Sequence, residues 1–144
     1  MRTPDEAVAD IARYFESMTP AALARLDEIY TADARFKDPF NEVQGLSAIR
    51  GVFEHMYTSL DAPRFIVHER IVQREQVFLS WDFVFSLRGR KTLPLTVRGG
   101  SHLKLAADGR ISLHRDYWDV AEELYEKLPV LGGLMRWLKR RVNS

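Results

Sequence analysis

The first sixty residues carry mainly the apolar spacing of helices. Across 4–18, apolar residues recur every three or four positions, which places them along one face of a helix. A second segment of this kind, 19–30, has Tyr30 at the end of its buried side, and a third covers 46–60. The alternating segment 34–38 lies between the second and the third. We therefore predict two helices, a short strand and a third helix.

From residue 64 the apolar period shortens to two. Apolar and polar residues alternate over four long segments, which are 64–72, 77–87, 92–105 and 110–119. Alternation is the pattern of a strand with one buried face, and the short turns between the segments favour antiparallel neighbours. Helices followed by such a meander predict an α+β domain, with the helices packed on one face of a curved sheet.

The end of the chain, 120–144, is predicted to be a helical extension of a single domain that covers 1–144. A helical segment over 120–127 is followed by a break at Pro129, and then by a basic amphipathic helix over 134–142. The break is short, so we expect the last helix to pack on its own domain or on a partner rather than on a membrane. Gating of a pocket is a possible consequence.

Composition narrows the function classes. The chain has 144 residues, 46% of them apolar and 28% charged, which is typical of one globular domain. With no cysteine, disulfides and thiolate chemistry are excluded, and a net charge of +1 gives no reason to expect nucleic acid as a partner. The N-terminal residues lack the apolar stretch of a secretory signal, and no segment is long and apolar enough to span a membrane. We expect a cytoplasmic protein.

The last predicted strand carries the most informative residues. In 113–119 the alternation puts His114, Asp116 and Trp118 on one face of the strand. On an exposed face such a triplet is ordinary. In a cavity, a carboxylate that has lost water beside an imidazole becomes an acid/base pair. We expect the cavity, because the apolar register of 77–87 matches the face of Trp118.

Two segments resemble the nuclear transport factor 2-like superfamily, which includes ketosteroid isomerases, limonene epoxide hydrolases and SnoaL-like polyketide cyclases. They are 30–39, with the sequence YTADARFKDP, and 108–119, with the sequence DGRISLHRDYWD. Gly45 and 48–50 extend the first one. The resemblance covers the chain to about Val120. It implies a cone-shaped, mixed and mainly antiparallel sheet with helices on its concave face.

The resemblance also implies catalytic residues. The isomerase pattern asks for a tyrosine on the first helix and an aspartate before a proline, which Tyr14 and Asp38 match. The cyclase pattern asks for an acid and a histidine in the sheet, which Asp116 and His114 match. Asp38 is then the expected general base, and Tyr14 a hydrogen-bond donor. Asp116 with His114 is expected to be a second acid/base group or an oxyanion donor.

Each of these residues also has a purely structural interpretation. Asp38 suits a turn that its own carboxylate closes, and Tyr14 suits a core position with its hydroxyl on a backbone carbonyl. Asp116 suits a surface ion pair, and His114 a core position with satisfied ring nitrogens.

Some positions depart from the family patterns. Ser101 stands where the isomerases have their second acid, and Trp81 and Phe83 stand where the epoxide hydrolases have a charged pair. These replacements favour isomerase- or cyclase-type acid/base chemistry over authentic steroid isomerisation or epoxide hydrolysis. The residues expected to line an apolar pocket, rather than merely to fill the core, are Phe15, Phe40, Phe53, Met56, Trp81, Phe83, Phe85, Ser101 and Trp118.

The expected partners are a small hydrophobic molecule with a carbonyl group and a second copy of the chain. Dimerisation is predicted through the outer face of the last strand, where Leu113, Arg115 and Tyr117 alternate with the site residues. No cofactor or metal is expected, because the remaining histidines show no ligand spacing with acids. A non-catalytic ligand-binding protein and a protein-interaction module are the alternatives to an enzyme.

Overall fold

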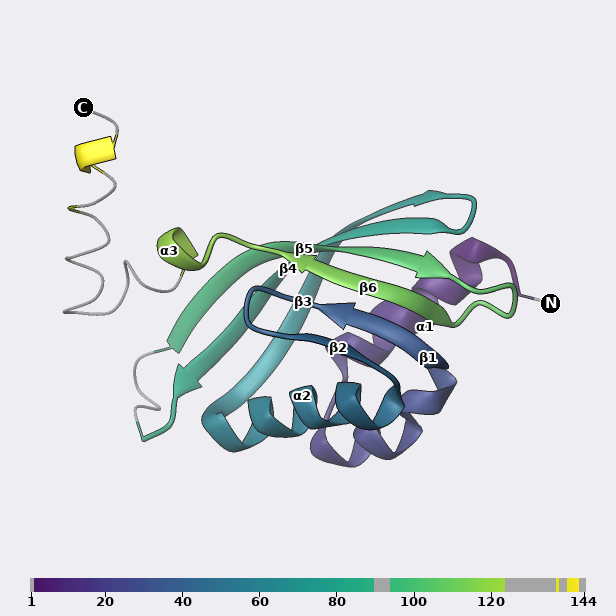
Figure 1. Cartoon of the computed structure of the whole chain (residues 1–144), viewed down its shortest axis with the longest axis horizontal. Helices are drawn as coiled ribbons and strands as arrows, with labels where there is room; N and C mark the ends of the chain where they lie inside the picture. Colours follow the sequence, from purple (N-terminus) through teal and green to yellow (C-terminus); the bar gives the residue numbers. More distant parts are fainter. Residues whose placement is uncertain (1, 90–93, 124–136, 138–139, 143–144) are drawn as a thin grey trace.

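The computed structural model describes residues 2–89, 94–123, 137 and 140–142 (Figure 1). In these residues helices come first and long strands follow, as the spacing predicts. The elements in chain order are α1 (Pro4–Glu16), the 3₁₀ helix η1 (Pro20–Glu28), β1 (Tyr30–Lys37), β2 (Glu42–Gln44), α2 (Leu46–Ser59), β3 (Leu60–Gln73), β4 (Gln76–Leu87), β5 (Pro94–Leu105), β6 (Ile111–Tyr117) and α3 (Val120–Glu123). The predicted helix over 134–142 lies largely outside the described residues, as does the second half of 120–127.

The strands form one mixed sheet in the order β2-β1-β6-β5-β4-β3. Neighbours are antiparallel except β1 and β6, which run parallel with Phe36 opposite His114. This pairing joins the N-terminal part of the chain to the end of the meander. The predicted α+β class with a mainly antiparallel sheet is confirmed.

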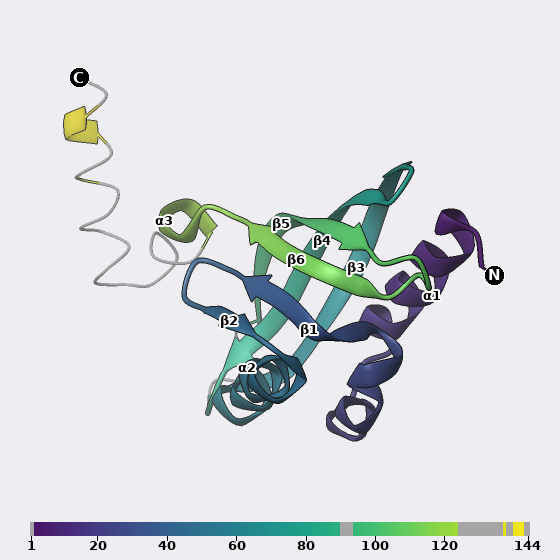
Figure 2. The same ribbon diagram turned by 45° about the vertical axis from the view of Figure 1, so that its right-hand side comes forward.

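The sheet is curved around the helices. α1 packs against β3, while α2 contacts β1 and β2 near one edge of the sheet and β3 at the other. One helix can reach both edges only if the sheet bends, and Figures 1 and 2 show this bend around α1 and α2. The concave face is therefore the buried face, and the helices cover it. None of the helices among the described residues is long and apolar enough to span a membrane.

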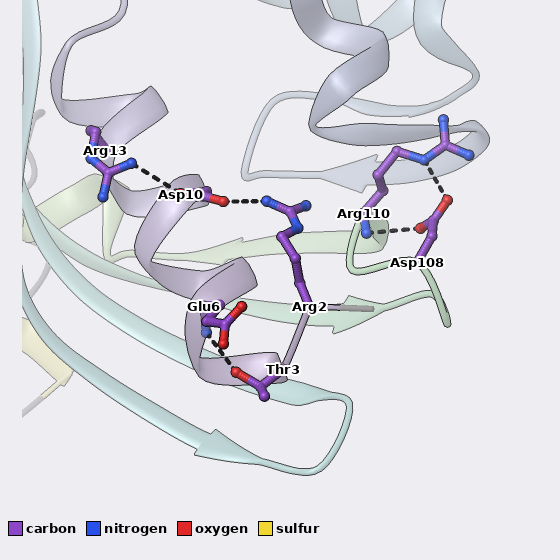
Figure 3. Close-up of polar contacts among 7 residues, drawn as sticks. All are labelled: Arg2, Thr3, Glu6, Asp10, Arg13, Asp108 and Arg110. Carbon is purple, nitrogen blue, oxygen red and sulfur yellow. Dashed lines mark hydrogen bonds and ion pairs between the residues drawn. The ribbon is translucent and has the colours of Figure 1, made fainter.

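α1 starts at a side-chain cap and buries one face. The hydroxyl of Thr3 accepts a hydrogen bond from the N–H of Glu6, and a proline follows Thr3 at the first helical position. On the exposed side, Asp10 pairs with Arg2 and with Arg13 (Figure 3). Exposed pairs of this kind add little stability, so the buried apolar face accounts for the position of α1.

The turn between β5 and β6 packs against the start of α1. Asp108 accepts hydrogen bonds from the backbone N–H and the Nε of Arg110 (Figure 3). Gly109 has a φ of +89°, which suits glycine, and a Cβ there would lie 3.1 Å from the Cβ of Ala7. The turn therefore packs directly on the helix.

Three of the differences from the sequence prediction concern the second helix, β2 and the last strand. The second helix ends at Glu28, with Arg25 outside helical φ/ψ, so Tyr30 begins β1 instead of ending a helix. The short strand β2 was not predicted. The last strand ends at Tyr117, because the carboxylate of Asp119 accepts a hydrogen bond from Glu122 at the start of α3.

Candidate active site

Two adjoining cavities lie between the concave face of the sheet and the helices. The larger measures about 270 Å³, and the smaller, deeper one about 30 Å³. Four residues line both, namely Phe53, Phe65, Trp81 and Asp116. Asp116 therefore stands at the boundary between a narrow inner space and a ligand-sized outer one.

The walls of the larger cavity are mostly aromatic. Phe65 stacks on Phe83 with ring centroids 4.6 Å apart and meets Trp81 edge-on at 6.1 Å. At the opposite end Phe40, 59% exposed, meets the Trp118 ring edge-on at 5.7 Å. Each of the nine residues expected to line a pocket borders one of the two cavities: Phe15 and Ser101 the smaller, Phe40, Met56, Phe83, Phe85 and Trp118 the larger, and Phe53 and Trp81 both.

Asp116 is held by a hydroxyl from the neighbouring strand. Ser101 lies directly opposite Asp116 in the β5–β6 register, and its Oγ donates to Asp116 Oδ1 over 2.5 Å. The indole Nε1 of Trp81 donates to Ser101 Oγ over 2.8 Å. Because an indole N–H is only a donor, the single hydroxyl hydrogen of Ser101 is left for Asp116.

His114 contacts the same carboxylate oxygen. Its Nε2 lies 2.7 Å from Asp116 Oδ1, and its Nδ1 lies 2.6 Å from the hydroxyl of Tyr30. The His114 ring is buried at 5% exposure, between the edge of Phe36 and the parallel ring of Tyr30. One chain of hydrogen bonds therefore runs from Tyr30 through His114, Asp116 and Ser101 to Trp81.

The donors in this chain define where the protons lie. The described contacts give the Tyr30 hydroxyl one acceptor, His114 Nδ1, so Tyr30 donates to it. His114 then carries its hydrogen on Nε2 and donates to Asp116. This assignment satisfies every contact with a neutral imidazole and an ionised carboxylate. Burial, followed by the nearby Asp116 and Tyr14, raises the pKa of Tyr30 well above its usual value, which keeps the phenol protonated.

The second oxygen of Asp116 remains available. Both described hydrogen bonds to this carboxylate end on Oδ1. Every buried side-chain nitrogen or oxygen among the described residues has a partner, so an Oδ2 without one must be reachable from open space. The Asp116 side chain is 17% exposed and borders both cavities. It therefore presents one open lone-pair oxygen there.

Asp38 borders the larger cavity but is held differently. Its Oδ1 accepts hydrogen bonds from the backbone N–H groups of Phe40 and Asn41, at 2.8 and 2.6 Å. The side-chain amide of Asn41 donates to both carboxylate oxygens. The carboxylate thus closes the turn between β1 and β2, which is the structural role open to an aspartate before Pro39.

Tyr14 is not brought to either cavity. Its hydroxyl donates to the backbone carbonyl of Ala22 in η1 over 2.7 Å, and the ring is buried between α1 and the rest of the core. The tyrosine that joins the hydrogen-bond chain is Tyr30. The sequence pattern places Tyr30 in the second helix instead, because Leu23, Leu26 and Tyr30 have the spacing of one helix face.

Further polar groups at the mouth of the larger cavity were not predicted. His55 and Ser59 lie one turn apart on α2 and both border it, with Ser59 Oγ 3.2 Å from His55 Nε2. Positions i and i+4 share one face of a helix, and this spacing was the available signal.

Comparison with known proteins agrees with the fold. One similar solved structure is a protein of ketosteroid isomerase-like fold from Catenulispora acidiphila in complex with trimethylamine, at 19% identity and a TM-score of 0.70 over 85% of this chain and 92% of that one. A second is an NTF2-like protein from Burkholderia thailandensis, at 21% identity and a TM-score of 0.70 over 86% of this chain and 98% of that one. A third is a candidate SnoaL-like polyketide cyclase from Jannaschia, at 16% identity and a TM-score of 0.71 over 85% of this chain and 92% of that one. At these identities the likeness shows the fold alone.

No curated protein matches the sequence. The family model of the SnoaL-like domain matches residues 11–114, which includes the second half of α1, all of α2 and most of the sheet. This match confirms the resemblance seen in 30–39 and 108–119. The chain therefore belongs to the SnoaL-like domain family and has the fold shared by NTF2-like proteins and ketosteroid isomerases.

Proposed function

We propose that the protein is an acid/base enzyme of the isomerase or cyclase type, which removes a proton beside a carbonyl group of a small apolar substrate. The observation that carries the proposal is the open Oδ2 of Asp116, set among aromatic side chains. A carboxylate oxygen that accepts no hydrogen bond from the protein can accept a proton from a substrate in the cavity. Asp116 is assigned the role of general base.

The groups behind Asp116 orient it. Ser101 and His114 hold Oδ1, which leaves Oδ2 to receive the substrate proton. Tyr30 fixes the His114 tautomer that donates to Asp116, as the second partner of a catalytic imidazole commonly does. Asp38 has its oxygens engaged by N–H donors, so it is assigned to the wall of the site and to the turn.

Charge on the substrate oxygen requires a donor. Tyr14, which the resemblance suggests, has its hydroxyl on Ala22. Ser59 borders the cavity, and if His55 Nε2–H donates to its Oγ, the Ser59 hydroxyl hydrogen is free for the substrate. We assign the oxyanion contact to Ser59.

Hydrogen exchange tests the proposed reaction. Small apolar ketones and enones, such as cyclohexanone and cyclohexenone, are incubated with protein in D₂O, and deuterium at the carbon beside the carbonyl is followed by NMR. Wild type should exchange protons faster than buffer, and Asp116→Asn should not. Retention of such ligands without exchange would overturn the enzyme and indicate a binding protein.

A homodimer through the outer face of the sheet is part of the proposal. Tyr117 is 47% exposed and carries Arg115 on its ring at 4.7 Å, and Phe78 is 40% exposed on the same face. Exposed aromatic and arginine side chains are enriched in protein interfaces. Light scattering at high micromolar concentration should give twice the chain mass, and Tyr117→Glu should lower it; a monomeric wild type would contradict the dimer.

A further inference from the structure

The charges around the larger cavity are all of one sign. Among the described residues that line it, Asp38 and Asp116 are the only ones with a formal charge at neutral pH, and neither lysine nor arginine borders it. His55 lies at the exposed mouth with a ring nitrogen on Ser59. The cavity thus has two carboxylates and no permanent cation.

Asp116 has no cationic partner of its own. Its described hydrogen bonds come from the hydroxyl of Ser101 and from Nε2 of His114, whose Nδ1 contacts the Tyr30 hydroxyl, so no lysine or arginine pairs with it among the described residues. An ionised carboxylate in an apolar setting is costly unless a positive charge approaches it. Next to the unused oxygen, a cation should therefore bind more tightly than a neutral molecule of the same shape.

The aromatic walls favour the same charge. Eight of the lining residues are phenylalanine or tryptophan, and such rings attract cations through the negative potential of their faces. Apolar aliphatic walls would exclude water equally well, but they offer no preference for charge. The lining side chains are Phe36, Phe40, Phe53, Phe65, Trp81, Phe83, Phe85 and Trp118.

We infer that the cavity binds a small organic cation, an ammonium group with apolar substituents, which Asp116 and the aromatic faces contact together. This inference rests on the proposed function, because it concerns the same site, and it adds that the substrate carries a positive charge. A carbonyl compound that also carries an ammonium group presents both features that the site addresses. The volume of about 270 Å³ lies just under the usual range for ligand pockets, which limits the cation to a small one.

A pair of probes of equal shape tests the charge. Choline and 3,3-dimethylbutan-1-ol differ only in a quaternary nitrogen against a quaternary carbon. Calorimetric titration at 150 mM salt should give choline at least about tenfold tighter binding, the scale of a desolvated cation–π contact. Asp116→Asn should remove most of this preference, because the affinity for choline should fall much more than the affinity for the neutral alcohol.

Two further variants keep the result interpretable. Trp118→Leu removes an aromatic face without touching the hydrogen-bond chain, so it should lower choline affinity more than alcohol affinity. Glu54→Gln removes an exposed charge from α2 outside the cavity lining and should change neither. Equal binding of the two wild-type probes, binding of neither at millimolar concentration, or an equal effect of Glu54→Gln and Asp116→Asn would overturn the inference.

The outcome is separable from that of the proposed reaction. Proton exchange on neutral ketones without a preference for choline would overturn the cation alone. A preference for choline with no exchange on any ketone, including amino ketones, would overturn the enzyme alone.

Discussion

Two carboxylates that border the larger cavity are held in opposite ways. Asp116, on β6, is contacted by side chains from two strands and keeps one oxygen open. Asp38, at the β1–β2 turn, accepts its hydrogen bonds from the two residues after Pro39, and both of its oxygens are engaged. One carboxylate is therefore arranged toward the cavity and the other toward its own backbone.

This difference matters for assigning roles in a family where function varies on a shared fold. An aspartate that matches a catalytic position in sequence need not act as a base, because local N–H donors can occupy the lone pairs that would accept the proton. Lone-pair occupancy ranks Asp116 ahead of Asp38, although the resemblance alone suggests Asp38 as the base.

The largest expected effect is on catalysis. Asp116→Asn should lower the exchange rate on a responsive ketone by about 10²- to 10⁴-fold, the usual contribution of a general base. Asp38→Asn should lower it only a few-fold, because asparagine keeps an oxygen for the Phe40 and Asn41 N–H groups. Both are measured by deuterium incorporation at saturating ketone. A larger loss for Asp38→Asn would reverse the two assignments.

The next effect concerns the support of Asp116. A Cβ on Gly99 would lie 2.6 Å from the Trp81 ring, so Gly99→Ala must displace the indole that donates to Ser101. We expect a loss of about 1–3 kcal/mol in unfolding free energy and a shift of the Trp81 indole N–H resonance. Gly51→Ala is the matched control, since a Cβ on this exposed helical position meets nothing within 4 Å. That variant should be about 0.5–1 kcal/mol more stable than wild type. An unshifted indole resonance in Gly99→Ala would disprove the role of Gly99.

Tyr30 gives a prediction that depends on pH. Its raised pKa means that above about pH 10 the unfolded chain loses a proton that the folded chain retains. The stabilisation is complete below that pH and declines above it, by about 1.4 kcal/mol per pH unit until the folded phenol ionises. Tyr30→Phe lacks this term, so its denaturation midpoint should decline less steeply between pH 10 and 11. Parallel slopes for the two proteins would contradict the burial of the phenol.

At neutral pH the same variant removes the donor to His114 Nδ1. A buried nitrogen without its partner costs about 1–3 kcal/mol. Urea denaturation at pH 7 measures this loss.

Much of this site could be predicted from the alternation of side chains along each strand. Strand alternation alone places His114, Asp116 and Trp118 on one face, and the same alternation in β4 turns Trp81 and Phe85 toward them. Such local periodicity survives folding because one face of each strand must be buried.

Partners that meet through sheet order are harder to infer. Tyr30 and His114 are 84 residues apart and meet because β1 lies parallel to β6, a pairing that no local pattern encodes. The hydroxyl of Tyr14 donates to the carbonyl of Ala22 in η1, which is a 3₁₀ helix kinked at Arg25, and helical spacing does not predict this backbone. Long-range pairing and irregular backbone therefore decided which tyrosine joins the site.

The smallest expected effect belongs to the turn. Asp38→Ala removes the acceptor for the exposed Phe40 N–H and the part-buried Asn41 N–H. We expect about 1 kcal/mol lower unfolding free energy, because N–H groups in a surface turn can bind water instead. Asp108→Ala removes a similar acceptor from the β5–β6 turn, away from the cavities, and serves as the control. The two variants should lose comparable stability in urea. Only Asp38→Ala should also weaken ligand binding, by a few-fold, since Phe40 and its contact with Trp118 border the cavity. If Asp38→Ala instead destabilises the chain by more than 3 kcal/mol, its carboxylate is a buried structural acid. Asp38 and Asp116 would then differ in their contribution to stability rather than in their role in catalysis.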